Sequence, residues 1–402
     1  MSIRVSKPAV NLREKLSEID IPTTGSHGSQ LMKSVDASES FDLVRAGRKN
    51  MIINGAMNIN QRNGTSSYTP TNSAATYGGP DRWCVGDWTD GSLSVNMDGD
   101  PPNYPETGAG EFQKAMQIAC SGADTSLAST QNLHFFQNIE GQNCSHLAWG
   151  TGNAKPATLS FWVKTNRAGT YCVGLENNAT NRCCIREYYQ NGDNLWNKVV
   201  LTFPGCTDGT WEIGASIGIR VRFCLGSGTN FDDGVDGIWV NSDELTTGNQ
   251  ANFMDSTNNR FMITGVQLEE GTVATPFEHR SYGDEMLKCN RYYWTPIGTL
   301  ELAMWAHGIA DTSGIRIQAY PWPVEMRASP SLTYYDASSG GNLNKVYIQH
   351  PDKTNHTNIS VTFEPNAQGT DGGFKYPYGI SGFSDGQTGL CVPYRLTVSA
   401  EL

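Results

Sequence analysis

The 402-residue chain is long enough for two domains, and it combines few charged residues (17%) with 43 glycines and 10% aromatic residues. This composition is typical of an all-β, turn-rich protein. The formal net charge of -11 argues against binding to nucleic acid or to an anionic membrane surface, since both would repel the chain. No apolar run approaches the roughly 18–20 residues of a membrane helix, so we expect no membrane insertion.

The ten cysteines show no C-x-x-C spacing, and the N-terminus lacks the unbroken apolar core of a signal peptide. Several cysteines, such as Cys172 and Cys224, lie inside apparent strands. We therefore expect most of them to be buried free thiols that act as small hydrophobes. The adjacent Cys183 and Cys184 are expected to alternate between the two faces of a strand, and a redox pair is the alternative.

Residues 1–46 differ in character from the rest of the chain. Four apolar residues recur at helical spacing and predict a short amphipathic helix: Val10, Leu12, Leu16 and Ile19. Asn11 and Glu14 match a capping box, Pro22 ends the helix, and residues 23–30 form a Gly- and Ser-rich linker. Because so short a helix is marginal in water, it either frays or docks on a partner.

Short alternating strands between turn residues predict a β-sandwich over residues 47–280. It opens with a predicted hairpin, in which Met51–Ile53 and Met57–Ile59 flank an Asn54-Gly55 turn. The string Asp81-Arg82-Trp83 predicts a structural ion pair over a buried tryptophan. Further strands are expected at Leu93–Met97, Phe112–Ala119, Leu133–Asn138, Ala157–Lys164, Gly169–Leu175, Cys184–Gln190, Lys198–Phe203, Glu212–Phe223, Gly237–Asn241 and Arg260–Leu268.

The stretch Arg260–Trp294 closes this domain and leads out of it. Its strand comes last in the domain, and we expect it to pair with the first segment. The residue before Pro276 favours an extended exit, and residues 281–294 then form a predicted helical connector. We expect copies of the chain to meet along one face of that helix, made by Tyr282, Met286, Cys289 and Tyr293.

Residues 295–402 predict a smaller C-terminal β-sandwich domain with glycine-rich loops. Aromatic faces stack on sugar rings, and the aromatic candidates for such a role in this domain are Tyr334, Tyr335, Phe374, Tyr376 and Tyr378. The alternative is that these side chains pack between subunits or clamp their own loop.

Sequence motifs give little support to catalysis. Gly214–Gly218 matches G-x-S-x-G, but a strand-like sequence follows where a hydrolase needs a helix, so we expect no enzyme. The seven histidines lack the spacing of zinc ligands. A structural calcium ion is the cofactor that the sequence permits, held by three carboxylates of one loop: Asp232, Asp233 and Asp236. Solvated turns are the alternative for that loop.

Several strings resemble segments of bacteriophage tail-fibre and related virion appendage proteins. They are NMIINGAMNINQR at residues 50–62, ITGVQLEEG at 263–271, ATPFEHRS at 274–281 and CNRYYW at 289–294. The string PVEMRASP at 323–330 resembles the terminal domains of the same proteins. The region between 47 and 280 also resembles the jelly-roll domain shared by many carbohydrate-binding modules.

The resemblance implies a homotrimer that attaches to the phage tail or another virion protein through residues 1–22. It also implies that the distal domain binds host cell-surface carbohydrate, and that the protein is a tail appendage of the virion, made in the host bacterial cytoplasm. The alternative is a non-enzymatic structural component of the virion, such as a head fibre or a capsid decoration protein.

Overall fold

The computed structural model describes residues 49–97, 111–295, 322–335 and 395–402, together with five further strands between 306 and 392. Only the backbone of Tyr334 and Tyr335 is described. None of the helices in the described residues is both long and apolar enough to cross a membrane. The described residues do not include the predicted anchor or three of the aromatic candidates: Val10, Leu12, Leu16, Ile19, Phe374, Tyr376 and Tyr378.

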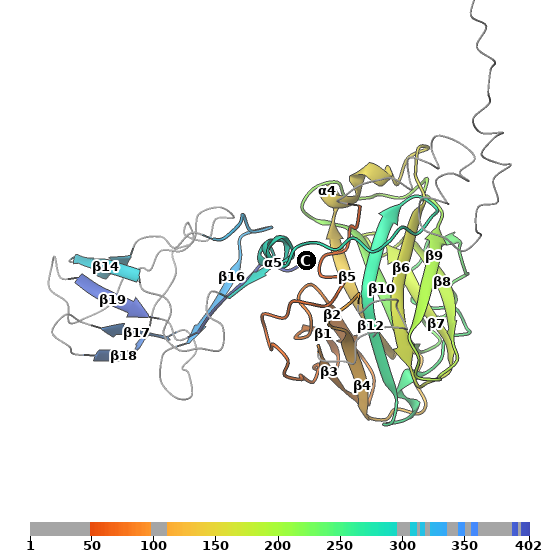
Figure 1. The fold of residues 1–402 in the computed structure, drawn as a ribbon, viewed down its shortest axis with the longest axis horizontal. Coiled ribbons are helices and arrows are strands. Elements are labelled where there is room, and N and C mark those ends of the chain that lie inside the picture. Colours follow the sequence, from red (N-terminus) through yellow and green to blue (C-terminus); the bar gives the residue numbers. More distant parts are fainter. Residues whose placement is uncertain are drawn as a thin grey trace, which may run out of the picture.

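The protein is an all-β sandwich of two antiparallel sheets, as the alternating sequence predicts (Figure 1). The seven-stranded sheet has the order β1 (Ala74–Tyr77), β2 (Cys84–Asp87), β5 (Asn132–Glu140), β10 (Ile217–Ser227), β7 (Gly169–Glu176), β8 (Cys183–Gln190) and β11 (Trp239–Val240). The five-stranded sheet has the order β3 (Ser92–Asn96), β4 (Met116–Gly122), β12 (Arg260–Glu270), β6 (Ala157–Thr165) and β9 (Asn197–Phe203).

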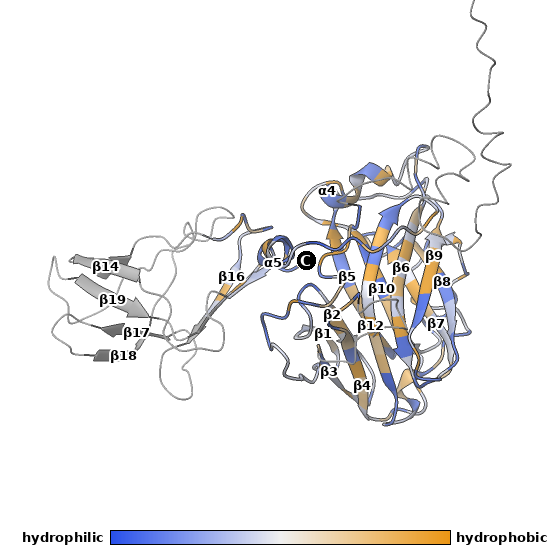
Figure 2. Cartoon of the chain, in the orientation of Figure 1, coloured by the Kyte–Doolittle hydropathy of each residue, from blue (hydrophilic) through white to orange (hydrophobic). Residues whose placement is uncertain are grey.

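The core lies between these sheets because successive side chains of a strand point to opposite faces. Figure 2 shows the resulting alternation of hydrophobic and hydrophilic residues along the strands. The centre of the core is aromatic: the rings of Phe135 and Phe223 stack with centroids 4.9 Å apart, and Trp83 lies 6.0 Å from Phe135. Burial of each such ring stabilises the fold by about 1.5–3 kcal/mol.

Most strands predicted for the sandwich are confirmed to within a few residues, but two of its strands were missed. β1 and β2 have four residues each, too few to show a clear alternation. The strand predicted from Glu212 begins at Ile217 as β10, and the G-x-S-x-G string lies where the chain enters it. No helix follows this string directly, so the described structure lacks the strand–turn–helix context of a nucleophile.

The cysteines confirm the prediction of buried thiols. Each cysteine side chain that the structure describes is buried and free. Cys184 packs in the main core, while the thiol of Cys183 donates to the Ser242 carbonyl 3.2 Å away. Burial raises the pKa of Cys184 to about 12, so its thiol stays protonated at neutral pH.

The hairpin predicted at residues 51–59 is wrong. These residues form turns and irregular backbone, and their apolar side chains reach the core without strand pairing. Met51 N–H instead donates to the Leu268 carbonyl at 2.9 Å, and Val266 N–H donates to the Gly55 carbonyl at 3.0 Å. A Cβ on Gly55 would lie 2.1 Å from the Val266 oxygen, so only glycine permits this approach. The expected contact between the first segment and the last strand is therefore confirmed.

Four short helices complete the described part of the sandwich and its exit: α4 (Gly141–Cys144), η1 (Ser145–Leu147), η2 (Phe253–Asp255) and α5 (Tyr282–Asn290). α5 begins at an N-cap, Ser281, whose hydroxyl accepts from the Asp284 N–H at 3.1 Å and donates to the Asp284 carboxylate at 2.7 Å. It corresponds to the predicted connector. The predicted meeting face is wrong, because Cys289 and Tyr293 are buried within the chain itself.

Two more antiparallel sheets follow α5. The first has the order β13 (Tyr293–Trp294), β20 (Arg395–Ser399) and β16 (Ser331–Tyr335). The second has the order β15 (Gly314–Ile317), β14 (Ala306–Asp311), β19 (Thr388–Val392), β17 (Lys345–Gln349) and β18 (Asn355–Ser360). Figure 1 shows the C-terminal end beside α5, next to the sandwich.

Buried charges join the sandwich to this C-terminal part at a site called the joint, formed by Arg82, Glu140, Arg291, Tyr292 and Glu401. The Arg82 guanidinium is buried, pairs with Glu401 and lies 3.5 Å above the Tyr292 ring. Glu140 accepts two hydrogen bonds from Arg291, at 2.8 and 2.9 Å, and one from the Tyr292 hydroxyl.

The joint corrects the prediction made for Asp81 and Arg82. Trp83 is buried as expected, but Asp81 pairs with Arg62, 3.7 Å away, while Arg82 pairs with Glu401. Neighbouring charges in the sequence therefore find partners that are distant along the chain.

Candidate binding cleft

A network of buried polar side chains binds the exit segment 271–285 to the first segment of the sandwich; we call it the seam. Asn50 holds both sides: its amide donates to the Val266 carbonyl at 3.1 Å, and its side-chain oxygen accepts from the N–H groups of Ile52 and Leu268. Each of these groups is buried, so losing its partner would leave a donor or acceptor without compensation. The Asn50 side chain therefore links two backbone segments that lie more than 200 residues apart in the sequence.

Gln267 and Glu269 extend the seam from β12. The Gln267 side chain donates to Glu269 at 2.9 Å and accepts from the Glu278 N–H at 2.8 Å. The Glu269 carboxylate accepts from both the N–H and the hydroxyl of Thr275, at 2.9 and 2.6 Å. These residues belong to the strings GVQLEEG and ATPFE, so the recognisable sequence has a structural role in fixing the exit segment.

Arg280 completes the seam beside α5. Its guanidinium donates to the carbonyls of Asn50 and Ile52 and to Glu285, and it lies 3.5 Å from Glu278. Glu285 in turn accepts from the Asn54 N–H. All the charges of this group are therefore paired within the chain, which is the condition for keeping them buried.

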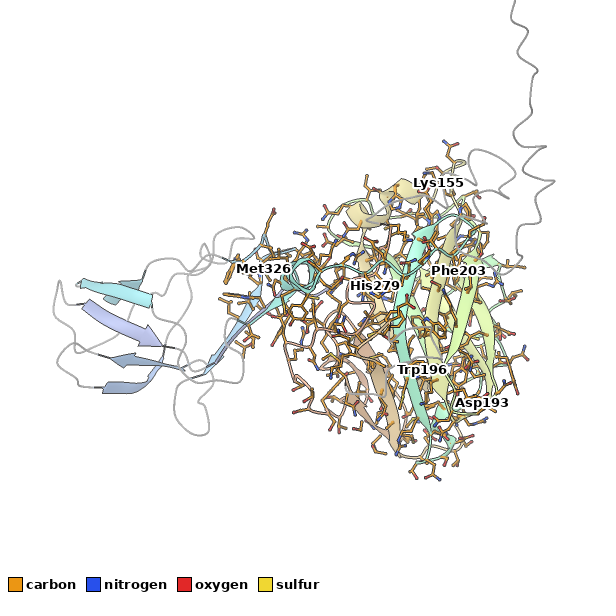
Figure 3. All side chains as sticks on the ribbon, viewed as in Figure 1. Lys155, Asp193, Trp196, Phe203, His279 and Met326 are labelled. Carbon is orange, nitrogen blue, oxygen red and sulfur yellow. The ribbon has the colours of Figure 1, made fainter. Side chains whose placement is uncertain are left out.

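A cleft of about 310 Å³ opens directly above the seam, between the first segment, the residues before β4 and the exit segment. Figure 3 labels His279 on that exit segment, beside the strands of the sandwich. The volume is at the lower end of the range of small-ligand sites. Its lining comprises Asn50, Asn54, Gly55, Ala56, Asn58, Ile59, Glu111, Gln113, Lys114, Phe277, Glu278, His279, Arg280, Tyr282 and Glu285.

Aromatic rings form one side of the cleft. Phe277 meets the buried Phe112 edge to face at 5.1 Å, and His279 meets Phe277 in the same way at 5.0 Å. Tyr282 projects from the first turn of α5 and is 63% exposed. Such rings offer rigid apolar area at a small cost in side-chain entropy.

The rim of the cleft differs from its floor in hydrogen-bonding capacity. Asn58 and Gln113 are exposed. Within the described part of the chain, their amides and the Tyr282 hydroxyl have no hydrogen-bond partner. The floor is therefore fixed by the seam, while the rim offers two amides and a phenol to a ligand. This combination of a rigid base and unpaired polar groups is favourable for binding, because little must be ordered when a ligand arrives.

The predicted calcium ligands are not brought together. Asp236 accepts hydrogen bonds from the Arg186 side chain and the Glu187 N–H, each at 3.0 Å, and the backbone N–H of Asp233 donates to Glu244. Among the residues that the structure describes, no group of three histidine, cysteine or acidic side chains is arranged to hold a metal ion. The carboxylates of Asp232, Asp233 and Asp236 therefore do not converge on one position where a metal ion could bind.

The outer face of the seven-stranded sheet carries a second group of aromatic and charged residues. Trp88 stacks on His134 with ring centroids 5.4 Å apart, an arrangement that a side chain at Gly86 would obstruct. Glu176 lies between two guanidinium groups, 2.5 Å from Arg222 and 3.3 Å from Arg220. Burial, with Arg222 and Arg220 nearby, holds the pKa of His134 well below its usual range, so the imidazole is neutral.

This outer face is closed to a ligand. His134 and Arg222 are only 6% and 9% exposed, and Phe231 and Leu245 pack against Cys172 and Cys224 on the same face. Three polar atoms there have no partner within the described residues: His134 Nδ1, Glu176 Oε1 and Arg222 Nε. Because these atoms are buried, the cleft remains the more accessible candidate.

The sequence interpretation missed the cleft residues Asn58, Gln113 and Tyr282. It placed sugar recognition in the C-terminal domain, on side chains that lie outside the described structure. The string ATPFEHRSYGDE at residues 274–285 carried a usable signal, because it places charged and aromatic residues close together in one short segment. That string was interpreted as a domain boundary, not as the wall of a site.

Comparison with known proteins finds distant structural likenesses but no family. No protein-family model matches the chain, and no curated protein matches it. A putative sugar binding protein from Bacteroides thetaiotaomicron is 16% identical, with a TM-score of 0.31, over 56% of this chain and 100% of that chain. A family 11 carbohydrate-binding module from Clostridium thermocellum is 8% identical, with a TM-score of 0.26, over 52% of this chain and 98% of that chain.

A third similar structure is the enzymatically active domain of tailspike protein 4 from bacteriophage CBA120. It is 12% identical, with a TM-score of 0.29, and the match covers 55% of this chain but only 21% of the tailspike chain. Likenesses at such low identities and TM-scores carry no argument about what this protein does. Its function must be argued from the cleft.

Proposed function

We propose that the protein is a non-enzymatic, glycan-binding component of a bacteriophage virion, of the tail-fibre type. The observation that carries the binding part of this proposal is the cleft, whose rim amides and phenol lie beside aromatic rings and have no hydrogen-bond partner among the described residues. Sugars present hydroxyl groups that donate and accept hydrogen bonds, together with apolar faces that stack on aromatic rings. The rim formed by Asn58, Gln113 and Tyr282 offers both kinds of contact.

The carboxylates in the cleft support binding over catalysis. A glycosidase needs one carboxylic acid and one carboxylate free to act on the scissile bond. Glu278 and Glu285 are instead occupied: each accepts a backbone N–H of the first segment, and each lies within 3.5 Å of the Arg280 guanidinium. Glu111 is left as the carboxylate at the rim, which does not make a catalytic pair.

The virion part of the proposal rests on the resemblance of the seam strings to tail-fibre proteins. On that basis the protein attaches through residues 1–22, assembles as a homotrimer and binds host cell-surface carbohydrate. Three copies would turn weak sugar contacts into stable adsorption, because later contacts form at a high effective concentration. A structural virion component without receptor contact is the alternative.

Adsorption to cells tests the receptor role. The purified full-length protein is expected to bind host cells, to block phage infection and to lose both effects when soluble cell-surface glycan is added. Purified protein that neither adsorbs nor blocks infection would contradict the proposal and favour the structural alternative. An antibody to the chain that labels the head of the particle would also favour that alternative.

Deletion of residues 1–22 tests the attachment role. The shortened protein is expected to keep its β-sheet circular dichroism and its glycan binding but to disappear from purified virions. Incorporation of the shortened protein at the normal level would contradict attachment through these residues.

A further inference from the structure

The charges around the cleft are not equally available to a ligand. Three carboxylates and two cations line it: Glu111, Glu278, Glu285, Lys114 and Arg280. Recognition of a sugar carboxylate needs a free guanidinium or ammonium group with its donors directed outward. Arg280 cannot fill that role, because its terminal nitrogens donate to two carbonyls and to Glu285. Its Nε is buried within the chain, 3.5 Å from Glu278, and faces no ligand. Lys114 is already engaged as well.

Glu111 is the carboxylate that a ligand at the rim would meet. Its side chain is 31% exposed and lies 3.4 Å from the His279 ring. The two other carboxylates are compensated by Arg280, and their oxygens accept N–H groups of the first segment. An incoming anion would therefore approach a partly exposed negative charge, while Arg280, the guanidinium that lines the cleft, is already committed to the seam.

We infer that the cleft selects uncharged glycan residues, bearing hydroxyl or acetamido groups, and discriminates against uronic and sialic acids. This inference rests on the proposed function and names the ligand class of the same site. The amides of Asn58 and Gln113 each donate and accept, which matches hydroxyl and acetamido groups but gives a carboxylate only half of their capacity. Glu111 supplies the repulsive element that specificity requires.

Paired glycans provide the direct test. The full-length protein is applied to an array of neutral oligosaccharides, each with a counterpart that differs by a carboxylate at C6 or by a terminal sialic acid. Neutral members are expected to bind about fivefold more tightly than their acidic counterparts at low salt, the effect of one partly exposed like charge. The ratio is expected to shrink at 1 M salt, where the Debye length is only about 3 Å.

Glu111→Gln separates this charge effect from shape. The variant keeps the side-chain size and removes the charge, so the ratio of neutral to acidic affinity is expected to fall towards one. Glu212→Gln is the control, since Glu212 is an exposed glutamate that does not line the cleft, and it is expected to leave the ratio unchanged.

The possible outcomes test the selectivity for uncharged glycans separately from glycan binding itself. Acidic glycans that bind as tightly as neutral ones, or a ratio that Glu111→Gln leaves unchanged, would overturn the inference and leave glycan binding intact. Failure to bind any glycan on the array, together with failure to adsorb to host cells, would overturn the proposed function and the inference with it.

Discussion

The seam beneath the cleft and the joint at the C-terminal part use similar residues but leave different surfaces. Both contain arginine paired with glutamate, and both connect segments that are far apart in the sequence. At the joint, Tyr292 and Glu401 cover the guanidinium of Arg82, and its side chain is 1% exposed. Above the seam, solvent reaches the amides of Asn58 and Gln113, which have no hydrogen-bond partner among the residues that the structure describes. A cluster of polar residues indicates a binding site when its hydrogen-bonding groups are unused. A high density of charged residues alone does not indicate one.

The largest expected effect comes from breaking the joint. Arg82→Met should lower the free energy of unfolding by about 3 kcal/mol, because the buried Glu401 loses one of its two guanidinium partners and keeps only Arg62, 3.0 Å away. Chemical denaturation measures the change. Arg167→Met is the control: Arg167 pairs with Asp255 at 2.8 Å, but both side chains are 32% exposed, so the loss should stay below about 1 kcal/mol. Equal losses in the two variants would contradict the role assigned to Arg82.

Breaking the seam should affect stability and binding together. Asn50→Ala leaves the N–H groups of Ile52 and Leu268 buried without acceptors, and should cost about 2–3 kcal/mol of unfolding free energy. Glycan affinity should fall as well, since Asn50 lies in the floor of the cleft. Asn72→Ala is the control, because Asn72 is exposed although it also donates to two carbonyls. A destabilised Asn50→Ala variant with normal glycan affinity would show that glycan binding does not depend on the seam.

The contributions of two carboxylates of the joint region to stability should change with pH in opposite directions. Burial raises the pKa of Asp81 to about 6, against the attraction of Arg62. The folded state therefore holds this proton where the unfolded chain has lost it, and the contribution of Asp81 to stability grows as the pH falls from about 6 towards 4. Burial also raises the pKa of Glu140, but hydrogen bonds from Arg291 and Tyr292 outweigh it and lower the pKa. The stability from Glu140 is present above its unfolded pKa and is lost as the pH falls through its folded pKa.

Unfolding measured from about pH 2 to pH 8 checks these signs, because the Glu140 effect lies below its unfolded pKa. Asp81→Asn should flatten the gain in stability on acidification, and Glu140→Gln should reduce the loss at the acidic end. Parallel curves for wild type and Asp81→Asn would show that Asp81 does not titrate in this range.

The smallest effect is expected at the rim, where a side chain can be removed without loss of folding. Tyr282→Ala should weaken glycan binding roughly threefold to tenfold, the loss of one aromatic contact, with little change in melting temperature. Tyr189→Ala is closely matched, because Tyr189 is 64% exposed and lies on β8, outside the cleft. The same loss of affinity in both variants would count against the cleft as the site.

The strands of the sandwich could be predicted because an alternating sequence has one stable arrangement when one face is buried. The Leu159, Phe161 and Val163 side chains on β6 point into the core as that alternation requires. The hairpin at residues 51–59 was mispredicted because an Asn-Gly turn between apolar residues satisfies the same local pattern. Its backbone groups are used instead by β12, more than 200 residues later, which no local pattern reports.

The sequence by itself determined the all-β sandwich, the buried thiols and the contact between the first segment and the last strand. It also indicated that residues 260–294 hold a recognisable segment, but not what that segment builds. Only the tertiary structure decided that the Asn50 side chain forms its hydrogen bonds within the seam, while Asn58, of identical chemistry, is exposed at the rim with no partner among the described residues. The physical reason is that a side chain's remaining hydrogen-bonding capacity depends on partners brought to it by the fold.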